Sequence, residues 1–247
     1  MSISSSVTRF TDYFKRNGLR ATAHRLGLAT KRALFSSRSV LFYCDLSTLK
    51  PASEDSPNSW KAERHTNQTG ISPADLQAII SVWNPVQTRR NMKERFELGA
   101  SLWLIKSEDH LAGYGWTLQG RTVEPHYFPL GPSDTHLFDF HVFPQYRGRG
   151  VNPFLVNCIL RNLAAECQKR AFIEAAEWNR AQLASLSRTP FQRLGSASKF
   201  TFFRCTMVFW GSSEPVRQTL ARQTLARQTN DATGNLSRPV TNRTEKA

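Results

Sequence analysis

A strand-like segment runs directly into a short glycine-containing turn and then into a helix-like segment. Residues 136–143 (HLFDFHVF) are strongly strand-like, and Pro144 ends them. The turn QYRGRG follows at residues 145–150, and residues 151–168 have the apolar spacing of a helix. This order of elements places the backbone of the turn close to the first N–H groups of the helix.

The chemistry of this turn predicts an anion cradle. Gly148 and Gly150 allow left-handed backbone and keep side chains away from the helix start. The helix N-terminus offers free N–H groups and a partial positive charge, and Arg147 and Arg149 add two cations. The turn is neither a P-loop, since no Gly-Lys-Ser/Thr follows, nor the dinucleotide fingerprint, since the third glycine is missing. A bound phosphate or pyrophosphate is the expectation.

Helix-like and strand-like segments alternate through the middle of the chain. This alternation predicts an α/β (mixed α+β) fold with a central mixed sheet flanked by helices. Helices are expected at 72–83, 85–98, 151–168 and 179–188, strands at 40–44, 101–106, 110–118, 122–128, 136–143, 171–178 and 198–210, and a polar loop at 50–70.

Positive charge is concentrated at the two ends of the 247 residues. The formal net charge is +14, of which residues 1–40 contribute +7 and residues 215–247 contribute +4. The remaining +3 lies in the middle, so a nucleic-acid groove is not expected in the core. A nucleic-acid-binding protein that works through its basic ends is a separate hypothesis, which predicts binding that weakens steeply with salt.

Three domains are predicted. Residues 1–39 form a basic amphipathic helical extension, which either docks on an anionic membrane or acidic partner or packs on its own domain. Residues 40–212 form the folded domain, and residues 213–247, with the repeat RQTLA, form a disordered basic tail. A frayed helix is the alternative for this tail, because Leu and Ala tolerate a helix well.

Several classes of protein are excluded by what the sequence lacks. No apolar run exceeds five residues, whereas a membrane-spanning helix needs about 20. No secretory signal is visible, and the four cysteines form neither a CxxC pair nor a zinc-finger pattern. A cytoplasmic protein, peripheral at the membrane at most and without a metal, is the expectation.

The stretch FHVFPQYRGRGV at 140–151 resembles the acyl-CoA-binding signature of the GNAT acetyltransferase superfamily, Gln/Arg-x-x-Gly-x-Gly/Ala after a strand. EAAEWN at 174–179 resembles the family's next strand, and Phe191 follows at the spacing of the family's Gly-Phe. The resemblance covers about residues 72–210. It implies a sheet that splays between strands 136–143 and 171–178, with acetyl-CoA held in the gap.

The resemblance also implies which residues contact acetyl-CoA. They are the backbone of Phe140, His141 and Val142, the turn residues Gln145, Tyr146, Arg147, Gly148, Arg149 and Gly150, and Asn179, which reaches the pantetheine. A backbone N–H near Val142 is the expected donor to the oxyanion.

Transfer of an acetyl group to an amine requires a base. Glu174 is the first candidate, because a carboxylate on this strand matches a family position and half-burial raises a carboxyl pKa towards neutrality. Asp139 and His141 are rivals. Both alternate with the apolar Phe138, Phe140 and Val142 and so are expected on the opposite face of the strand.

The sequence departs from the family at the acid that protonates the thiolate. The family's Tyr is replaced by Leu186, beside Ser185 and Ser187, and Pro190 stands where the family has Gly. Ser187 is the candidate hydrogen-bond donor to the sulfur. Residues 72–98 and 119–135 are expected to select the acceptor amine, with Trp83, Trp116, His126 and Tyr127 either lining its site or packing in the core.

Two functions follow from the resemblance. One is an acetyl-CoA-dependent N-acetyltransferase that moves an acyl group directly from the thioester to an amine of unknown identity. The other is a catalytically weak acyl-CoA-binding sensor or scaffold with a basic docking extension, which the loss of the Tyr favours.

Overall fold

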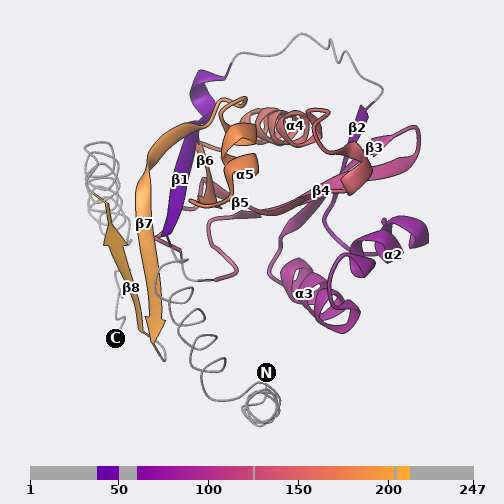
Figure 1. Cartoon of the computed structure of the whole chain (residues 1–247), viewed down its shortest axis with the longest axis horizontal. Coiled ribbons are helices and arrows are strands. Elements are labelled where there is room, and N and C mark those ends of the chain that lie inside the picture. The colour runs from indigo at the N-terminus through magenta and orange to yellow at the C-terminus, as the bar shows by residue number, and fades with distance from the viewer. Residues whose placement is uncertain (1–37, 50–59, 125, 203–204, 212–247) are drawn as a thin grey trace, which may run out of the picture.

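A computed structural model describes residues 38–49, 60–124, 126–202 and 205–211 (Figure 1). The predicted tail at 213–247 and all but the last two residues of the predicted extension at 1–39 lie outside these ranges. Among the described helices, none has the length and apolar character needed to cross a membrane.

Eight strands form one sheet, in the order β2-β3-β4-β5-β6-β1-β7-β8. β5 and β6 pair in parallel, and every other neighbouring pair is antiparallel. The strands are β1 (Arg38–Asp45), β2 (Trp60–His65), β3 (Ser101–Ser107), β4 (His110–Gln119), β5 (Asp134–Val142), β6 (Arg170–Ala176), β7 (Gln192–Phe202) and β8 (Cys205–Trp210). The predicted mixed α+β class is confirmed.

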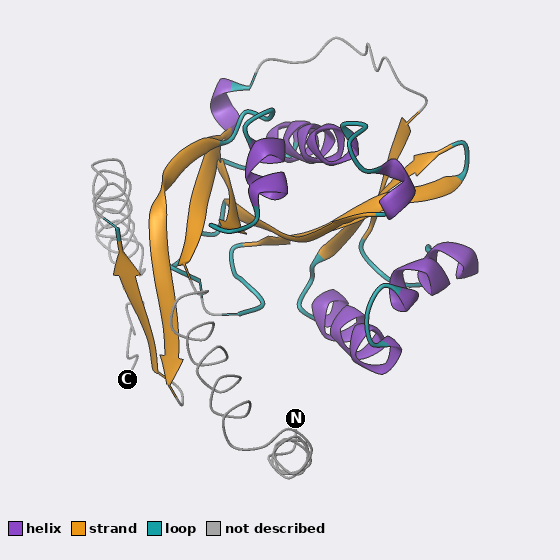
Figure 2. Cartoon of the chain, in the orientation of Figure 1, coloured by secondary structure: helices purple, strands orange, loops and turns teal. Residues whose placement is uncertain are grey.

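Helices cover both faces of this sheet (Figure 2). α4 and α5 lie on one face, and α2 and α3 lie on the other. The described α-helices are α2 (Pro73–Ser81), α3 (Pro85–Glu97), α4 (Val151–Ala165) and α5 (Arg180–Leu186), and the short 3₁₀ helices are η1 (Leu46–Thr48) and η2 (Pro144–Tyr146). Ser72 and Asn84 start α2 and α3 by accepting hydrogen bonds from the first-turn amides, each followed by proline at the first helical position.

Side-chain alternation along the strands divides the core into three clusters. The first lies under α4, where Leu155 and Ile159 pack on Leu137 and Ile173. On the opposite face, a second cluster joins β3 and β4 to α2 and α3, and a third gathers around Phe172 and the loop that carries Phe128. Burial of these apolar side chains is the main stabilising term of the fold.

β5 and β6 run together and then part. Their parallel pairing extends over four residue pairs, from Asp134–Arg170 to Leu137–Ile173. β5 continues to Val142 and β6 to Ala176, so the second half of each strand has no partner in the other. The predicted splay between these two strands is therefore present.

A β-bulge changes the phase of β5 at the point where the strands part. Trp116 of β4 faces Phe138, whereas Tyr114 faces His141, so Gly115 lies opposite two residues of β5. Asp139 adopts a left-handed φ of 52° there. Phe138 consequently packs in the second cluster and Phe140 in the first.

Two expectations about elements are wrong. Residues 60–65, assigned to a polar loop, form β2, because Trp60 and Ala62 pack on the first cluster beside β3. The described residues between 122 and 128 form no strand; Tyr127 and Phe128 fill the third cluster from a loop instead. The final strand region expected at 198–210 is made by two antiparallel strands, β7 and β8.

Candidate functional site

A cleft of about 560 Å³ lies between the end of β5, the 145–150 turn, the start of α4 and one side of α5. Most of the predicted cofactor-binding residues line it, and several neighbours that sequence reasoning did not single out line it too. The lining residues are Phe140, His141, Val142, Tyr146, Arg147, Gly148, Gly150, Val151, Asn152, Pro153, Asn179, Ala181, Gln182, Ala184, Ser185 and Arg188.

The glycines of the turn give its backbone a shape that other residues rarely adopt. Gly148 has φ 76° and Gly150 has φ 81°. A Cβ built on Gly148 would meet nothing within 4 Å, so the backbone conformation and the open space above it, not crowding, make glycine suitable here. Gly150 precedes α4, whose first amides have no intrahelical partner.

The amides at the end of this turn and at the start of α4 are free, whereas those of Tyr146 and Arg147 donate to Phe143 and Pro144. In the described part of the chain, the main-chain N–H groups of residues 148–152 donate no hydrogen bond, and the first helical bond runs from Phe154 to Gly150. Free amides beside a helix N-terminus form a site for an anion such as a pyrophosphate. The described residues thus leave these amides unpaired, as the predicted cradle requires, and the binding of an anion there stays a prediction.

The arginines of the turn take different positions. Arg147 lines the cleft and donates from Nε to the carbonyl of Val142 at 3.1 Å, which holds the turn against the end of β5. Arg149 lies outside the lining, with its guanidinium 5.9 Å from the centre of the Tyr146 ring. Gln145 is also outside the lining.

The opposite wall of the cleft is formed by α5. Asn179 caps this helix by accepting from the amide of Gln182, so its side chain is partly used in structure. Ser185 faces the cleft, and Asn152 donates to its hydroxyl at 2.8 Å. Ser187, the residue expected to contact the sulfur, lies outside the cleft and donates to the carbonyl of Ala184. Leu186 is fully buried in the core.

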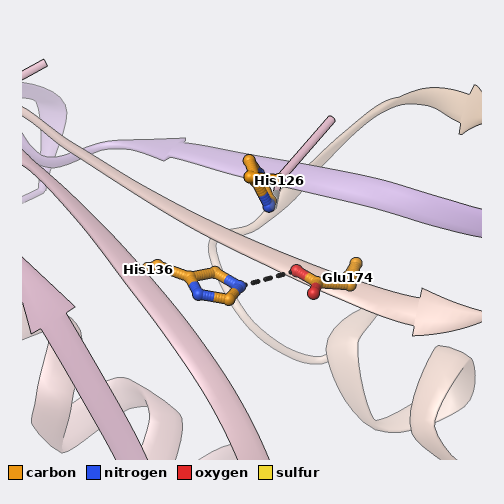
Figure 3. Close-up of side chains that lie close together, drawn as sticks. All are labelled: His126, His136 and Glu174. Atoms are coloured by element: carbon orange, nitrogen blue, oxygen red, sulfur yellow. Dashed lines mark hydrogen bonds and ion pairs between the residues drawn. The ribbon is translucent and has the colours of Figure 1, made fainter. Parts of the chain in front are cut away.

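Glu174 lies on the face of the sheet opposite α4, one residue beyond the last β5–β6 pair. His136 of β5 donates from Nε2 to its carboxylate at 2.8 Å (Figure 3). His126, from the loop before β5, sits above this hydrogen bond with a ring nitrogen facing it. Gln182, which lines the cleft, donates to the main-chain carbonyl of Glu174 at 3.5 Å, so the carboxylate and the cleft are neighbours through the sheet.

The pKa of Glu174 is shifted opposite to the sequence-based expectation. Burial raises it, but the charge and hydrogen bond of His136, with smaller contributions from His126 and Lys199, lower it below the ordinary glutamate value. Glu174 is therefore ionised at neutral pH. Its side chain is 28% exposed, which leaves the carboxylate accessible to a small polar group.

The two rival bases are held by other contacts. Asp139, at the bulge, accepts from Arg95 of α3 at 2.6 Å, and Arg95 lies over the rings of Trp116 and Phe138. His141 stacks on Tyr114 with ring centres 5.5 Å apart. Burial, and then the charge of Arg147, lower the pKa of His141, so its imidazole is neutral near pH 7.

The bulge corrects the expected alternation on β5. Asp139 and Phe138 contact the same arginine of α3, so they do not lie on opposite faces. Of the aromatic residues considered for the acceptor, Trp116 and Tyr127 are buried in the core, whereas Trp83 is 65% exposed.

Sequence reasoning missed two groups of polar residues. Asn152, Gln182 and Ser185 line the cleft from helices, and Arg188 lines it from the turn after α5. Their polar character alone does not distinguish them from surface residues. Sequence reasoning also missed the pairing of His136 with Glu174, although both residues belong to strands that were predicted to be neighbours. The register of the parallel pair, with His136 opposite Phe172, would have been needed to find it.

Comparison with known proteins agrees with this geometry. Residues 74–186 match the model of the acetyltransferase (GNAT) family. No curated protein matches the chain.

Solved structures of similar shape share little sequence with this chain. A GNAT-family protein of Novosphingobium aromaticivorans is 15% identical with a TM-score of 0.43, over 64% of this chain and 62% of its own length. A GNAT-family acetyltransferase of Colwellia psychrerythraea is 12% identical with a TM-score of 0.47, over 64% and 53%. An acetyltransferase of Bacillus subtilis in complex with CoA is 15% identical with a TM-score of 0.40, over 52% and 74%.

The chain thus spans about half to two thirds of the first two of these proteins. The family match begins at α2 and ends with α5, so it includes the cleft, the bulge and the splayed strands. Residues 74–186 are a domain of the acetyltransferase (GNAT) family.

Proposed function

We propose that this protein is an acetyl-CoA-dependent N-acetyltransferase that moves an acetyl group directly from the thioester to an amine. The observation that carries the proposal is the cleft beside the splayed strands, whose floor is a run of unpaired amides at residues 148–152. These amides suit the pyrophosphate of acetyl-CoA, and the gap between β5 and β6 suits its pantetheine arm.

The reaction follows from the chemistry of a thioester and an amine. The amine nitrogen attacks the thioester carbonyl, an N–C bond forms, the C–S bond breaks, and the amine loses a proton. No covalent enzyme intermediate is required, so the site needs positioned groups for two protons and one oxyanion.

Glu174 is the proposed base. It is ionised, partly exposed and adjacent to the point where β5 and β6 part. His136 holds its carboxylate in one orientation, and the lowered pKa makes it a weaker base than an isolated buried glutamate. The acceptor amine then approaches from the face opposite α4, where Glu174 lies.

Ser185 replaces Ser187 as the proposed donor to the departing thiolate. Its hydroxyl lines the cleft and accepts from Asn152, which leaves the hydroxyl hydrogen free to point elsewhere. A serine is a poor acid, so this hydrogen bond stabilises the thiolate and solvent supplies the proton.

A weak acyl-CoA-binding sensor is the second candidate, and one observation favours it. Leu186 is fully buried and packed in the core at the position where the resemblance places a tyrosine acid. Binding of acetyl-CoA without useful turnover would then be the function of the cleft.

Two measurements on the full chain test both candidates. Acetyl-CoA at about a hundredfold excess over Kd should stabilise the protein by about 2.7 kcal/mol, seen as a rise in Tm. Release of free thiol, followed over a panel of primary amines, should then show turnover with at least one amine. A Tm rise without thiol release for any amine favours the sensor, and the absence of both contradicts the proposed cleft.

A further inference from the structure

We propose that His126, His136 and Glu174 form a binding site for a divalent transition-metal ion of the Zn²⁺ class, on the face of the sheet opposite the acetyl-CoA cleft. Each side chain offers one ligand atom, and these atoms all lie within 4.8 Å of one another. Two imidazoles and one carboxylate are a donor set that zinc and its first-row neighbours accept.

The three ligands come from three separate segments that the sheet brings together (Figure 3). His136 lies on β5, Glu174 lies on β6, and His126 lies on the loop between β4 and β5. The rings of His126 and His136 are 4.9 Å apart between centres. The three side chains therefore surround one point instead of lying along one strand.

Packing fixes both imidazoles. His136 is 6% exposed and stacks on Phe138 with ring centres 5.3 Å apart. His126 contacts Phe128 edge-on at 5.0 Å. Phe138 packs on the second core cluster and Phe128 belongs to the third, so the proposed site lies between these two clusters.

The protein leaves hydrogen-bonding capacity unused at this point. Within the described residues, Nε2 of His126 is buried and has no hydrogen-bond partner. Nδ1 of His136 is also unpaired there, but the nitrogen of His136 that faces Glu174 is Nε2. A buried polar nitrogen without a partner costs about 1–3 kcal/mol, so an unpaired imidazole that faces a carboxylate calls for a ligand or an ion.

The available nitrogen atoms of the cluster suit a cation. Nε2 of His126 has no hydrogen-bond partner among the described residues, so it is available to an ion in the tautomer that carries its hydrogen on Nδ1. A bound ion would replace the hydrogen between Nε2 of His136 and Glu174, which requires the tautomer of His136 with its hydrogen on Nδ1.

The charge of Lys199 opposes the bound ion. It reaches both His126 and Glu174, and its ammonium lies 5.3 Å from the centre of the Tyr127 ring. Two neutral imidazoles and one carboxylate leave a bound Zn²⁺ with a net charge of about +1. We therefore expect weaker binding than at a structural zinc site made of thiolates.

The ligands must close slightly around the ion. At metal–ligand distances of about 2.0–2.2 Å, the ligand atoms of a tetrahedral site are roughly 3.3 Å from one another. In this structure the three ligand atoms lie within 4.8 Å of one another. Because packing holds both imidazoles, a rotamer adjustment of the partly exposed Glu174 has to cover this difference. Three protein ligands leave a fourth position, which water reaches because Glu174 is 28% exposed.

One consequence rests on the proposed function. A metal ion on Glu174 occupies the carboxylate that is proposed to accept the proton of the amine. Zn²⁺ should then inhibit acetyl transfer without displacing acetyl-CoA, which lies across the sheet.

Metal binding by the full chain is the direct test, with Zn²⁺ in calorimetry and Co²⁺ as a spectroscopic probe. We expect one saturable Zn²⁺ equivalent that His126→Ala weakens at least tenfold, and a tetrahedral visible spectrum with Co²⁺ that the same variant loses. Glu174→Gln should also weaken binding and keeps the shape of the side chain.

The matched control is His110→Ala, which removes an exposed histidine from the β3–β4 turn. It should leave Zn²⁺ affinity unchanged. Failure of the wild-type chain to bind Zn²⁺ saturably, or equal affinity in wild type, His126→Ala and His126→Gln, overturns the proposal. Circular dichroism of each variant shows whether it is folded. If His126→Ala does not fold, His126→Gln replaces it in the binding measurement.

The metal site and the proposed function fail separately. Zn²⁺ binding without thiol release from acetyl-CoA leaves the metal site standing and contradicts the transferase. Thiol release that proceeds unchanged in saturating Zn²⁺, together with proven binding, contradicts only the inhibitory consequence.

Discussion

The two faces of the sheet at the splay differ in how their polar groups are assembled. On the α4 face, the cleft is made largely by consecutive residues, from Phe140 through Pro153, with α5 as its second wall. On the opposite face, His126, His136 and Glu174 meet from three segments, and Asp139 meets Arg95 from two. A local turn creates the first site, whereas the strand register creates the second.

Because of this difference, one face is suited to binding the cofactor and the other to transferring a proton. The α4 face offers amides and an open cleft, which suit an anion and an extended chain, and the one imidazole among its lining residues, that of His141, is stacked on Tyr114. The opposite face offers an ionised carboxylate held by an imidazole. Binding and proton transfer should therefore be separable by mutation.

Glu174→Gln should have the largest effect. Loss of the base lowers turnover by about 100-fold or more, because general base catalysis contributes 10²–10⁴. The Tm rise with acetyl-CoA should persist, since the cleft lies on the other face. Thiol release measures turnover, and the thermal shift measures acetyl-CoA binding. The control is Glu177→Gln, which changes an exposed residue. Undiminished turnover would move the base role to Asp139, His141 or water.

Gly148→Trp should give the converse result. A tryptophan at φ 76° strains the turn and fills the open space over the free amides, so the stabilisation of about 2.7 kcal/mol by acetyl-CoA should disappear. Gly99→Trp is the matched control, because Gly99 has φ 81° and lies elsewhere with open space around it. A Tm rise that survives in Gly148→Trp would contradict the cradle.

Gly115→Ala tests the bulge that links the two faces. A Cβ at this position would approach the Phe140 ring to 2.5 Å, so the variant should lose about 1–3 kcal/mol of unfolding free energy. Chemical denaturation measures the loss. In a Phe140→Ala background the same substitution should cost less, and an equal cost in both backgrounds would exclude the ring as the cause.

Ser185→Ala should have the smallest effect, a fall in turnover of about tenfold or less. A thiol has a pKa near 8.5 in water, so its thiolate leaves with little help. Ser187→Ala is the control, because this serine lies outside the cleft. Equal turnover in both variants would show that no serine hydroxyl assists the leaving sulfur.

The sequence was sufficient for features that depend on local order. The helices that begin at Ser72-Pro73 and Asn84-Pro85, the hairpin of β3 and β4, and the glycine turn all follow from caps, periodicity and turn residues within a few positions. The splay was inferred from the family resemblance, and the interrupted pairing of β5 with β6 confirms it.

Features that depend on distant partners were not accessible in the same way. Residues 60–65 look polar, yet they form β2 because β3 offers them an edge. The bulge at Asp139 depends on Gly115 in another strand, so alternation within β5 wrongly placed Phe138 on the same face as Phe140 and Val142. The pKa of Glu174 depends on His136, which is opposite only in the folded register, and burial alone gave the wrong direction.

The bulge at Asp139 also divides β5 into two halves whose side chains alternate between the two faces of the sheet in different phases. Before it, His136 and Phe138 face α2 and α3; after it, Phe140 and Val142 face α4. If β5 continued in strict alternation without the bulge, Phe140 and Val142 would lie on the same face as Phe138, away from α4. The glycine turn would then start from the wrong side of the sheet, so the extra residue opposite Gly115 matters to the site as much as the composition of the strand does.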